Sequence, residues 1–480
     1  MPSDTPALLW LRDDLRLADN PALTYAARGE RPLAALFVLD EDSPGIRPLG
    51  GAARWWLAGS LRALGAELAR QGVPLILRRG PAARVVGEVA SQIGAGLIAF
   101  NGRAGAAEAR VDRAVAERLK SEAREVAREQ AHLLHPPGTV ASAAGRMPRT
   151  FSAFHRAALK RPISPPLPAP KHLRGLAISV ASEALDEWAL EPSAPDWAGG
   201  LRAAWTPGER AAQERLNAFI AQGLDGYAEG RDRPDLAHVS RLSPHLRFGE
   251  ISPRQLMFAI RHAAADGAVP ARDAAKFEAE LYWREFSHHL LAEQADIARS
   301  NIQSGFDEFP WREAPGELKA WKRGRTGYPI VDAGMRQLWQ TGWMHNRVRM
   351  VVASFLSKHL LMDWRAGETW FWDTLVDADP ANNPANWQWV AGSGLDAAPY
   401  FRIFNPVLQG EKFDPLGAYV RAFVPEIRAL PAPFIHRPWT ADAATLAAAG
   451  VRLGATYPKP IVEHGAARER ALRALQSTRK

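Results

Sequence analysis

The run Ala7-Leu8-Leu9-Trp10-Leu11 is wholly apolar and has the length of one buried strand. Three similar runs follow, at residues 33–39, 74–77 and 97–100. The segments between them, 52–70, 82–93 and 106–122, have helix-forming composition, with apolar residues three and four positions apart. Strands that alternate with helices predict a doubly wound parallel sheet, so we expect an α/β domain over residues 1–132.

A sheet of this kind binds ligands beyond the carboxyl ends of its strands. No G-x-G-x-x-G sequence and no P-loop follows any of the four apolar runs. An ordinary dinucleotide site is therefore not expected in this domain.

The remainder of the chain has a different pattern. Residues 133–204 are rich in proline and lack sustained periodicity, which predicts a linker between domains. Beyond it the spacing of apolar residues is helical, at 209–222, 253–265, 272–293, 316–323, 332–342, 346–361 and 367–375. A chain of 480 residues exceeds the size of a single core, so we expect a second, all-α domain over 205–480.

The composition excludes several kinds of chemistry. The chain has no cysteine, which removes disulfides, thiolate nucleophiles and cysteine-bound zinc or iron–sulfur clusters. A net charge of +8 suits a polyanionic partner, although many proteins with a basic pI bind no nucleic acid. There is no apolar run of membrane-spanning length, and the start Met1-Pro2-Ser3-Asp4 is unlike an export leader, so we expect a cytoplasmic protein with no membrane contact.

Tryptophan is unusually concentrated in one part of the chain. Ten of the 17 tryptophans lie between Trp283 and Trp389. Indole rings stack on bases and cofactors, and they can be oxidised. This density indicates a site that uses indoles for stacking or for electron transfer.

Two segments of the second domain could contact phosphate or bases. Residues 231–246 combine hydroxyls, a guanidinium and backbone amides just before helical sequence, which is typical of phosphate binding and equally of an ordinary helix cap. Glu280, Trp283 and Arg284 share one side of a predicted helix. They could line a cleft for a base, or form an amphipathic face with an i,i+4 ion pair.

Two further segments offer polar side chains to a ligand. Asn346, Arg349 and Met350 are three and four residues apart and share a helical face. Residues 377–389 contain two carboxylates and three asparagines interrupted by proline, which argues against a stable helix interior and leaves the side chains available. Carboxylates suit ribose hydroxyls and ring N–H groups. The ligand spacing of a calcium loop is missing, so no metal is expected.

Several runs of the chain resemble the photolyase/cryptochrome family. They are residues 10–20, 328–336, 341–350, 386–389, 397–406 and 457–462. Because they occur in order over nearly the whole chain, the sequence is identified as a member, closest in pattern to the bacterial class I and III photolyases of cyclobutane pyrimidine dimers. Members bind reduced FAD non-covalently in the helical domain.

The resemblance implies a role for individual residues around FAD. The phosphates would be held by Tyr227, Val239, Ser240, Arg241, Leu242 and Ser243, with Val239 in place of a threonine common in relatives. The flavin and ribose would be contacted by Arg284, Asn346, Arg349, Asp377 and Asp379, with Arg349 paired to Asp377. Asn383 would face flavin N5. An amide is not an acid, which favours the reduced anionic flavin that repairs DNA.

The resemblance also implies a reaction. Excited reduced FAD would give an electron to a pyrimidine dimer flipped out of DNA, and the electron would return after the ring opens. The dimer and its phosphates would be contacted by Arg231, Glu280, Trp283, Asn346, Met350 and Trp389. Trp387, Trp364 and Trp311 would carry electrons to oxidised flavin, with Trp343, Trp370 and Trp372 as other possible routes; taken singly, each of these indoles is as typical of a core. We expect a monomer.

A second, light-harvesting chromophore is common in relatives. Glu108 aligns with an acidic contact to folate, so methenyltetrahydrofolate is preferred over a deazaflavin, and Trp55 or Trp56 is an alternative place for it. The main rival function is a cryptochrome-type blue-light receptor, against which Asn383, Trp283 and Trp389 argue. Repair of (6-4) photoproducts is disfavoured because the two histidines of eukaryotic (6-4) enzymes are replaced here by Asn346 and Met350, and the bacterial (6-4) type needs cysteines.

Overall fold

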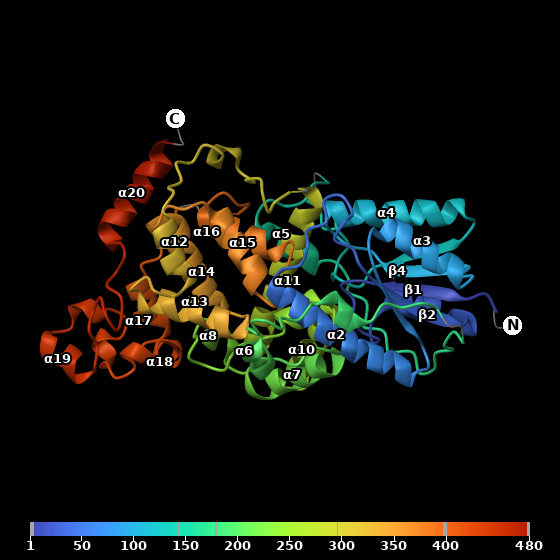
Figure 1. Ribbon diagram of the computed structural model, residues 1–480, viewed down its shortest axis with the longest axis horizontal. Coiled ribbons are helices and arrows are strands. Elements are labelled where there is room, and N and C mark those ends of the chain that lie inside the picture. The colour runs from blue at the N-terminus through green and yellow to red at the C-terminus, as the bar shows by residue number, and fades with distance from the viewer. Residues whose placement is uncertain (1–3, 143–144, 178–179, 295, 397–400, 478–480) are drawn as a thin grey trace. The chain divides into compact units, whose positions relative to one another are not determined.

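Five parallel strands form a single sheet near the N-terminus (Figure 1). The computed structural model describes residues 4–142, 145–177, 180–294, 296–396 and 401–477; residues 397–400, part of the run 397–406 quoted above, lie outside these ranges. The strands are β1 (Ala7–Leu11), β2 (Leu33–Leu39), β3 (Leu75–Arg79), β4 (Leu97–Asn101) and β5 (Glu125–Glu129). Their order is β3-β2-β1-β4-β5, and every pairing is parallel. The predicted doubly wound sheet is confirmed.

The sequences of the central strands are continuously apolar because helices cover both faces of the sheet. All residues of β1, β2 and β4 are buried. Helices α3 (Ala82–Gln92) and α4 (Ala106–Ser121) pack on one face, and α2 (Gly51–Arg70) lies on the opposite face (Figure 1). A parallel sheet with helices on both faces requires this continuous hydrophobicity.

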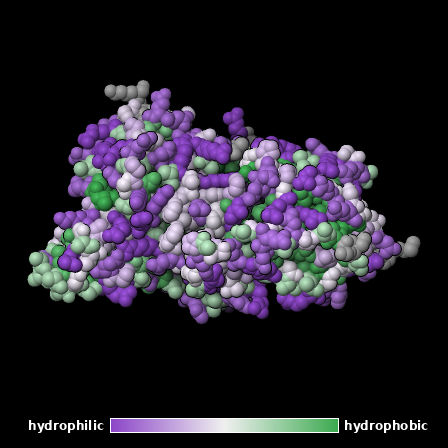
Figure 2. Space-filling model, in the orientation of Figure 1, coloured by the Kyte–Doolittle hydropathy of each residue, from purple (hydrophilic) through white to green (hydrophobic). Residues whose placement is uncertain are grey.

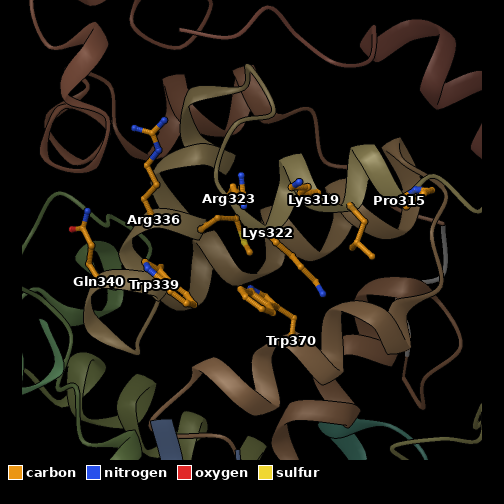
Figure 3. A pocket seen from close by; sticks show the side chains of 10 residues that line it. Pro315, Lys319, Lys322, Arg323, Arg336, Trp339, Gln340 and Trp370 are labelled. Atoms are coloured by element: carbon orange, nitrogen blue, oxygen red, sulfur yellow. The ribbon is translucent and has the colours of Figure 1, made fainter. Parts of the chain in front are cut away.

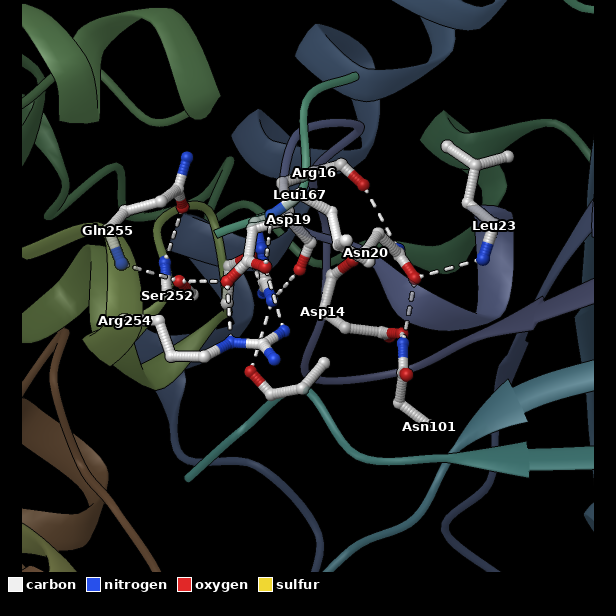
Figure 4. A network of polar contacts seen from close by, with 12 residues as sticks. Asp14, Arg16, Asp19, Asn20, Leu23, Asn101, Leu167, Ser252, Arg254 and Gln255 are labelled. Atoms are coloured by element: carbon white, nitrogen blue, oxygen red, sulfur yellow. Dashed lines mark hydrogen bonds and ion pairs between the residues drawn. The ribbon is translucent and has the colours of Figure 1, made fainter. Parts of the chain in front are cut away.

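A polar network ties the loop after β1 to later parts of the chain (Figure 4). Asp19 accepts hydrogen bonds from the Arg254 guanidinium, at 2.7 and 3.0 Å, and from the Ser252 hydroxyl at 2.5 Å. Asn101 Nδ2 donates to Asp14 at 2.6 Å and to Asn20 at 2.8 Å. Asp14, Asp19, Asn20 and Asn101 are buried, so this network fixes the start of α10 (Pro253–Ala265) to the loop that follows β1.

The chain divides by contact density into two units. The first, called here the sheet unit, comprises residues 1–225 and 240–295; the second, called the helical unit, comprises 226–239 and 296–480. The boundaries 1–132, 133–204 and 205–480 stay a prediction. The further helices of the sheet unit are α1 (Pro21–Ala26), α5 (Phe151–Leu159), α6 (Gly199–Ala204), α7 (Glu209–Gln222), α9 (Ser243–Arg247), α10 (Pro253–Ala265) and α11 (Ala271–Glu293).

The helical unit contains no strand among its described residues, which confirms the predicted all-α character. Its helices are α8 (Tyr227–Gly230), α12 (Pro315–Lys322), α13 (Pro329–Thr341), α14 (Asn346–Ser354), α15 (Trp364–Thr374), α16 (Asn382–Ala391), α17 (Pro406–Phe413), α18 (Ala418–Phe423), α19 (Ala443–Ala448) and α20 (His464–Ser477). A π-helix, Phe355–His359, continues α14. Gly334 lets α13 and α14 approach closely, because a Cβ there would clash with the Val348 side chain.

Aromatic side chains dominate the core of the helical unit. Trp321, Trp364, Phe371 and Trp387 are buried in one hydrophobic cluster. The surface in view is mostly hydrophilic, with smaller hydrophobic patches between (Figure 2). Among the helices of the described ranges, none combines the length and apolar composition needed to cross a bilayer.

Candidate functional site

The acidic and amide-rich segment 377–389 lies at the start of a helix. Asp379 Oδ1 accepts hydrogen bonds from the backbone N–H of Ala381 at 2.9 Å and of Asn382 at 2.7 Å, which fixes the first turn of α16. The prediction that this stretch avoids a helix was wrong for residues 382–389. Pro384 falls in the first turn of α16, where its missing N–H costs no hydrogen bond.

The amide of Asn383 is held by a residue of the preceding helix. Asn383 Nδ2 donates to Glu368 Oε1 at 2.8 Å and to the Glu368 backbone oxygen at 3.1 Å. Both residues are buried. The donor side of the amide is therefore committed to Glu368, and Asn383 presents its carbonyl oxygen as an acceptor to a ligand.

Arg349 and Asp377 form an ion pair. Arg349 Nη2 lies 2.8 Å from Asp377 Oδ2, and its Nε donates to the Met344 backbone oxygen at 2.7 Å. The Asp377 side chain is only 4% exposed, whereas Arg349 is 24% exposed. The pair that the resemblance implied is thus present; its contact with a flavin stays a prediction.

The beginning of α14 carries the other candidate residues of this region. Asn346 is exposed at the first position, and Met350 is half-buried one turn further. The preceding His345 caps the helix, because its Nδ1 accepts the backbone N–H of Arg347 at 3.2 Å. Burial lowers the pKa of His345 from 6.5 to about 4, so the ring is neutral at pH 7 and able to accept this bond.

Residues 227–232 lie beside α14 within the helical unit. Asp232 pairs with the Arg347 guanidinium at 2.6 Å. The Arg231 guanidinium lies 5.8 Å from the centre of the Tyr227 ring. Tyr227 is buried and Arg231 is half-buried. The tyrosine hydroxyl and the guanidinium are groups that can bind a phosphate.

The three tryptophans proposed for electron transfer belong to one aromatic region. Trp387 and Trp364 are buried in the cluster described above, and Trp311 packs against it. Trp387 lies 5.0 Å from Phe371 and 6.2 Å from Trp321, between ring centres. Trp364 Nε1 donates to Asn301 Oδ1 at 2.9 Å. The half-buried Trp389 borders the same cluster.

In the sheet unit, α11 carries Glu280, Trp283 and Arg284. Glu280 pairs with Lys276 at 3.5 Å, and Arg284 donates to the His132 backbone oxygen at 2.8 Å. The i,i+4 ion pair of the amphipathic alternative therefore joins Glu280 to Lys276 instead of Arg284. Glu280 and Trp283 are half-buried, whereas Arg284 is buried.

One face of the Trp283 indole is covered by Phe151 of α5. The two rings are parallel within 6°, and their centres are 3.7 Å apart. This contact holds the indole in one orientation. An indole held in one orientation is suited to stacking on a flat ligand.

The phosphate candidates are distributed over both units. Tyr227 and Val239 belong to the helical unit, and residues 240–243 belong to the sheet unit. Arg241 has a φ of 53°, in the left-handed region, and its guanidinium lies 4.4 Å from the centre of the Trp205 ring. Burial, followed by the nearby Arg215, lowers the pKa of Arg241 to about 10. Leu242 N–H donates to Ser240 Oγ at 3.4 Å.

Glu108 lies in the first turn of α4, where an acidic side chain favours the helix dipole. Its carboxylate folds back against Gly105, so that a Cβ on that glycine would clash with it. The carboxylate thus covers its own helix end, and a folate contact at Glu108 stays a prediction.

Sequence reasoning missed three residues that support this region. Glu368 orients Asn383, Asn301 accepts the Trp364 indole N–H, and Trp321 contacts Trp387. Glu368 and Asn301 had no signal because each acts across a separation of at least 15 residues. Trp321 could have been found from its membership of the tryptophan-rich segment.

The polar groups of the helical unit fit one edge of a flavin nucleotide. Asp377, Asp379 and Asn383 are buried and offer acceptor oxygens, and Arg349 places a cation beside Asp377. Acceptors suit the N–H groups of the ring and the ribose hydroxyls, and the guanidinium favours an electron-rich ring.

Comparison with known proteins also indicates an FAD-binding domain. Residues 7–171 match the family model described as DNA photolyase, and residues 277–477 match the FAD binding domain of DNA photolyase. The deoxyribodipyrimidine photo-lyase of Agrobacterium fabrum is 48% identical over 99% of this chain and 98% of its own length. Cryptochrome-1 of Arabidopsis thaliana is 37% identical over 98% of this chain and 70% of its own length.

The fold agrees with these similarities. The crystal structure of a bacterial class III photolyase from Agrobacterium tumefaciens has a TM-score of 0.96 at 47% identity, covering 99% of this chain and 98% of that one. Two family models and a relative that is similar over its full length therefore show that the chain belongs to the DNA photolyase family and contains that family's FAD-binding domain.

Proposed function

We propose that the protein repairs cyclobutane pyrimidine dimers in DNA, driven by blue light and using non-covalently bound reduced FAD. The observation that carries the proposal is that Asp377, Asp379 and Asn383 are all buried, with Arg349 paired to Asp377, in a chain similar over 99% of its length to a deoxyribodipyrimidine photo-lyase. When bound, reduced FAD supplies the excited electron that opens the cyclobutane ring and takes it back afterwards.

The protein's own residues position the cofactor. Asp377 and Asp379 accept hydrogen bonds from ring and ribose donors, and Arg349 balances the negative charge of an electron-rich ring. Asn383, fixed by Glu368, offers an oxygen acceptor and no acidic proton at N5. Tyr227, Val239 and residues 240–243 hold the phosphates, and Arg284 and Asn346 line the flavin.

Other residues receive the lesion. A dimer inside duplex DNA cannot reach a buried cofactor, so the damaged pair must flip out. Trp283 and Trp389 stack on the pyrimidines, and Met350 supplies a soft apolar contact. Glu280 and Asn346 bond the pyrimidine edges, and Arg231 meets a phosphate, which makes DNA affinity fall with salt.

The remaining roles are electron transfer to the flavin and light harvesting. Trp387, Trp364 and Trp311 carry electrons to oxidised flavin. A second chromophore, methenyltetrahydrofolate, harvests light. The protein acts as a monomer.

The test is a repair assay with three substrates. Chemically reduced protein is illuminated with an oligonucleotide containing a cyclobutane dimer, with one containing a (6-4) photoproduct, and with undamaged DNA. We expect recovery of pyrimidine absorbance for the first substrate only, and none in the dark. A protein that takes up FAD and responds to light but repairs neither lesion would instead favour the cryptochrome-type receptor.

A further inference from the structure

A lysine lies within a buried segment of the helical unit. Lys358 belongs to the π-helix Phe355–His359, whose five residues are all buried. Lys358 itself is only 2% exposed, although lysine is almost never fully buried unless its charge is paired. Single-turn π-helices are frequent at functional sites. A partner for the charge of Lys358 is therefore expected close to its side chain.

Two neutral groups contact the Lys358 ammonium. Its Nζ donates a hydrogen bond to the Arg402 backbone oxygen at 2.6 Å, and it lies 4.2 Å from the centre of the Phe401 ring. A carbonyl oxygen and a ring face both stabilise an ammonium, but neither carries a net negative charge. An ammonium has three donors, so this single hydrogen bond leaves two of them for another ligand.

The charge of Lys358 is not compensated by an acid in the described part of the chain. Burial lowers the pKa of Lys358 from 10.5 to about 7. Among the described residues, its charged or titratable neighbours are His359, next to it in the chain, and Arg402. Burial lowers the pKa of His359 to about 3, so that ring is neutral at pH 7. A buried ammonium in these surroundings must either lose its proton or gain an anion.

A small cavity lies beside Lys358. Its volume is about 20 Å³, and it is lined by Lys358, Arg402 and the apolar residues Trp389, Val390, Phe401 and Phe404. This volume accommodates one water molecule or one ion of similar size. Within the described ranges no carboxylate lines the cavity, whereas Arg402 adds a second cation. The lining therefore favours an anion over a cation.

A larger cavity of the helical unit differs in this respect. It has a volume of about 710 Å³ and lies between α12, α13 and α15, with Trp339 and Trp370 in its lining (Figure 3). The Lys319 side chain in that lining is exposed, so water solvates its charge. Lys358 lacks this access to water, and only the small cavity can supply a counter-ion to it.

We propose that the cavity beside Lys358 binds a monatomic monovalent anion, of which chloride is the common example. The Lys358 ammonium supplies a charge and two hydrogen-bond donors, and Arg402 adds to the positive potential. The apolar walls and the small volume exclude phosphate, sulfate and carboxylates, which need more room and more donors. The bound anion thus neutralises a buried cation in the core of the helical unit.

The first test is the melting temperature of the full-length protein with FAD bound. Sodium chloride is compared with sodium gluconate at equal ionic strength, because gluconate is too large for the cavity. An anion that binds only the folded protein stabilises it by mass action. We expect the melting temperature to rise by about 1–2 °C for each tenfold increase in chloride once the site is occupied, and not to rise in gluconate.

The variant is Lys358→Met, which keeps the length of the side chain and removes its charge. It should abolish the difference between chloride and gluconate. That difference is the readout, because the loss of a buried charge also changes the melting temperature itself. Lys412→Met is the matched control: Lys412 Nζ also lies near a phenylalanine ring, 5.1 Å from the centre of Phe413, but its side chain is exposed. This control should retain the full effect of chloride.

The effect of chloride should also depend on pH. Only the ammonium form attracts an anion, and burial lowers the pKa of Lys358 to about 7. The stabilisation by chloride should therefore be largest near about pH 6 and decline toward about pH 9, where the amine is neutral. His359 stays neutral throughout this range. A chloride effect that is constant from pH 6 to 9 would contradict the assignment to Lys358.

Bromide locates the ion directly. A crystal of the unsubstituted protein is soaked in bromide, which replaces chloride and is identified by its anomalous X-ray scattering. We expect a peak at hydrogen-bonding distance from Lys358 Nζ. A cavity that contains only water would overturn the proposal, as would a chloride effect that survives in Lys358→Met. Bromide bound in the crystal without any chloride effect in solution would also overturn it. Because the crystal contains the unsubstituted protein, this test does not depend on the folding of Lys358→Met.

Discussion

Asn383 donates both a 2.8 Å hydrogen bond to the Glu368 carboxylate and a 3.1 Å hydrogen bond to the Glu368 backbone oxygen. Neither residue has a position in sequence that suggests this contact, and both are buried. The contact determines which end of the amide is available to a ligand. Glu368 therefore positions the amide of Asn383, and under the proposed function it would act on the flavin through that amide.

Removal of the Glu368 carboxylate should release the amide of Asn383. We expect Glu368→Ala to slow repair by about tenfold, because a buried hydrogen bond to a carboxylate is worth about 1.5–3 kcal/mol. Glu368→Gln, which keeps an acceptor oxygen, should retain most of the activity. The measurement is the repair rate of chemically reduced protein, together with the flavin absorption spectrum, which reports on the group at N5. Equal rates and spectra for Glu368→Ala and the unsubstituted protein would contradict the positioning role.

The Arg349–Asp377 pair should stabilise the helical unit as well as the cofactor. Arg349→Ala leaves a nearly buried carboxylate without its cation, which costs about 3–5 kcal/mol in the free energy of unfolding. Asp377→Asn removes that charge, so the double variant should be less destabilised than the sum of the single variants. Urea unfolding with and without added FAD measures these terms. Additive effects would show that the two residues act independently.

Photoreduction should depend on particular indoles and not on the aromatic cluster as a whole. We expect Trp387→Phe and Trp364→Phe to slow light-driven reduction of oxidised flavin by more than tenfold, because phenylalanine is much harder to oxidise. Trp321→Phe is the matched control, since Trp321 contacts Trp387 in the same cluster. Repair by chemically reduced protein should be unchanged in all three. A comparable loss of photoreduction in Trp321→Phe would point to a different route.

The capping histidine of α14 should make the protein sensitive to acid. Burial lowers the pKa of His345 from 6.5 to about 4, so the unfolded chain binds a proton between these pH values that the folded chain does not. The contribution to stability is present above pH 6.5 and is lost as pH falls toward 4, by about 3 kcal/mol at most. His345→Asn keeps a capping side chain and removes the titration. Its melting temperature should therefore fall less than that of the unsubstituted protein between pH 6.5 and 5, and an identical fall would contradict this assignment.

The features that could be predicted from sequence are those with local or periodic signals. The strands β1, β2 and β4 are apolar throughout because both faces of a parallel sheet are buried. Strand β5 was missed because it lies at the edge of the sheet, where Glu-Val-Ala-Arg-Glu exposes charged side chains. The single helix expected over 346–361 is α14 followed by a π-helix at Phe355–His359.

The candidate site could be predicted only in part, because some of its contacts join residues that are distant in the sequence. The positions of Asn346, Arg349 and Met350 on one helical turn follow from their spacing. The contact of Asn383 with Glu368 and the stack of Trp283 on Phe151 join residues that are 15 or more positions apart in the chain. Pro384 was interpreted as a helix breaker, but proline is tolerated in the first turn of a helix. The sequence alone did not show that α16 begins at Asn382, which places Pro384 in that turn.

The central claim is that buried groups near Asp377 and Asn383 hold an electron-rich flavin where it meets a flipped dimer. The most direct measurement is the fluorescence of the reduced flavin in the purified protein while an oligonucleotide with a single cyclobutane dimer is added. The account predicts that the fluorescence falls on binding, because the excited electron passes to the dimer, and that it recovers as illumination repairs the lesion. Undamaged DNA should leave it unchanged. If the dimer binds with no quenching, or if the protein takes up no FAD, the account is contradicted.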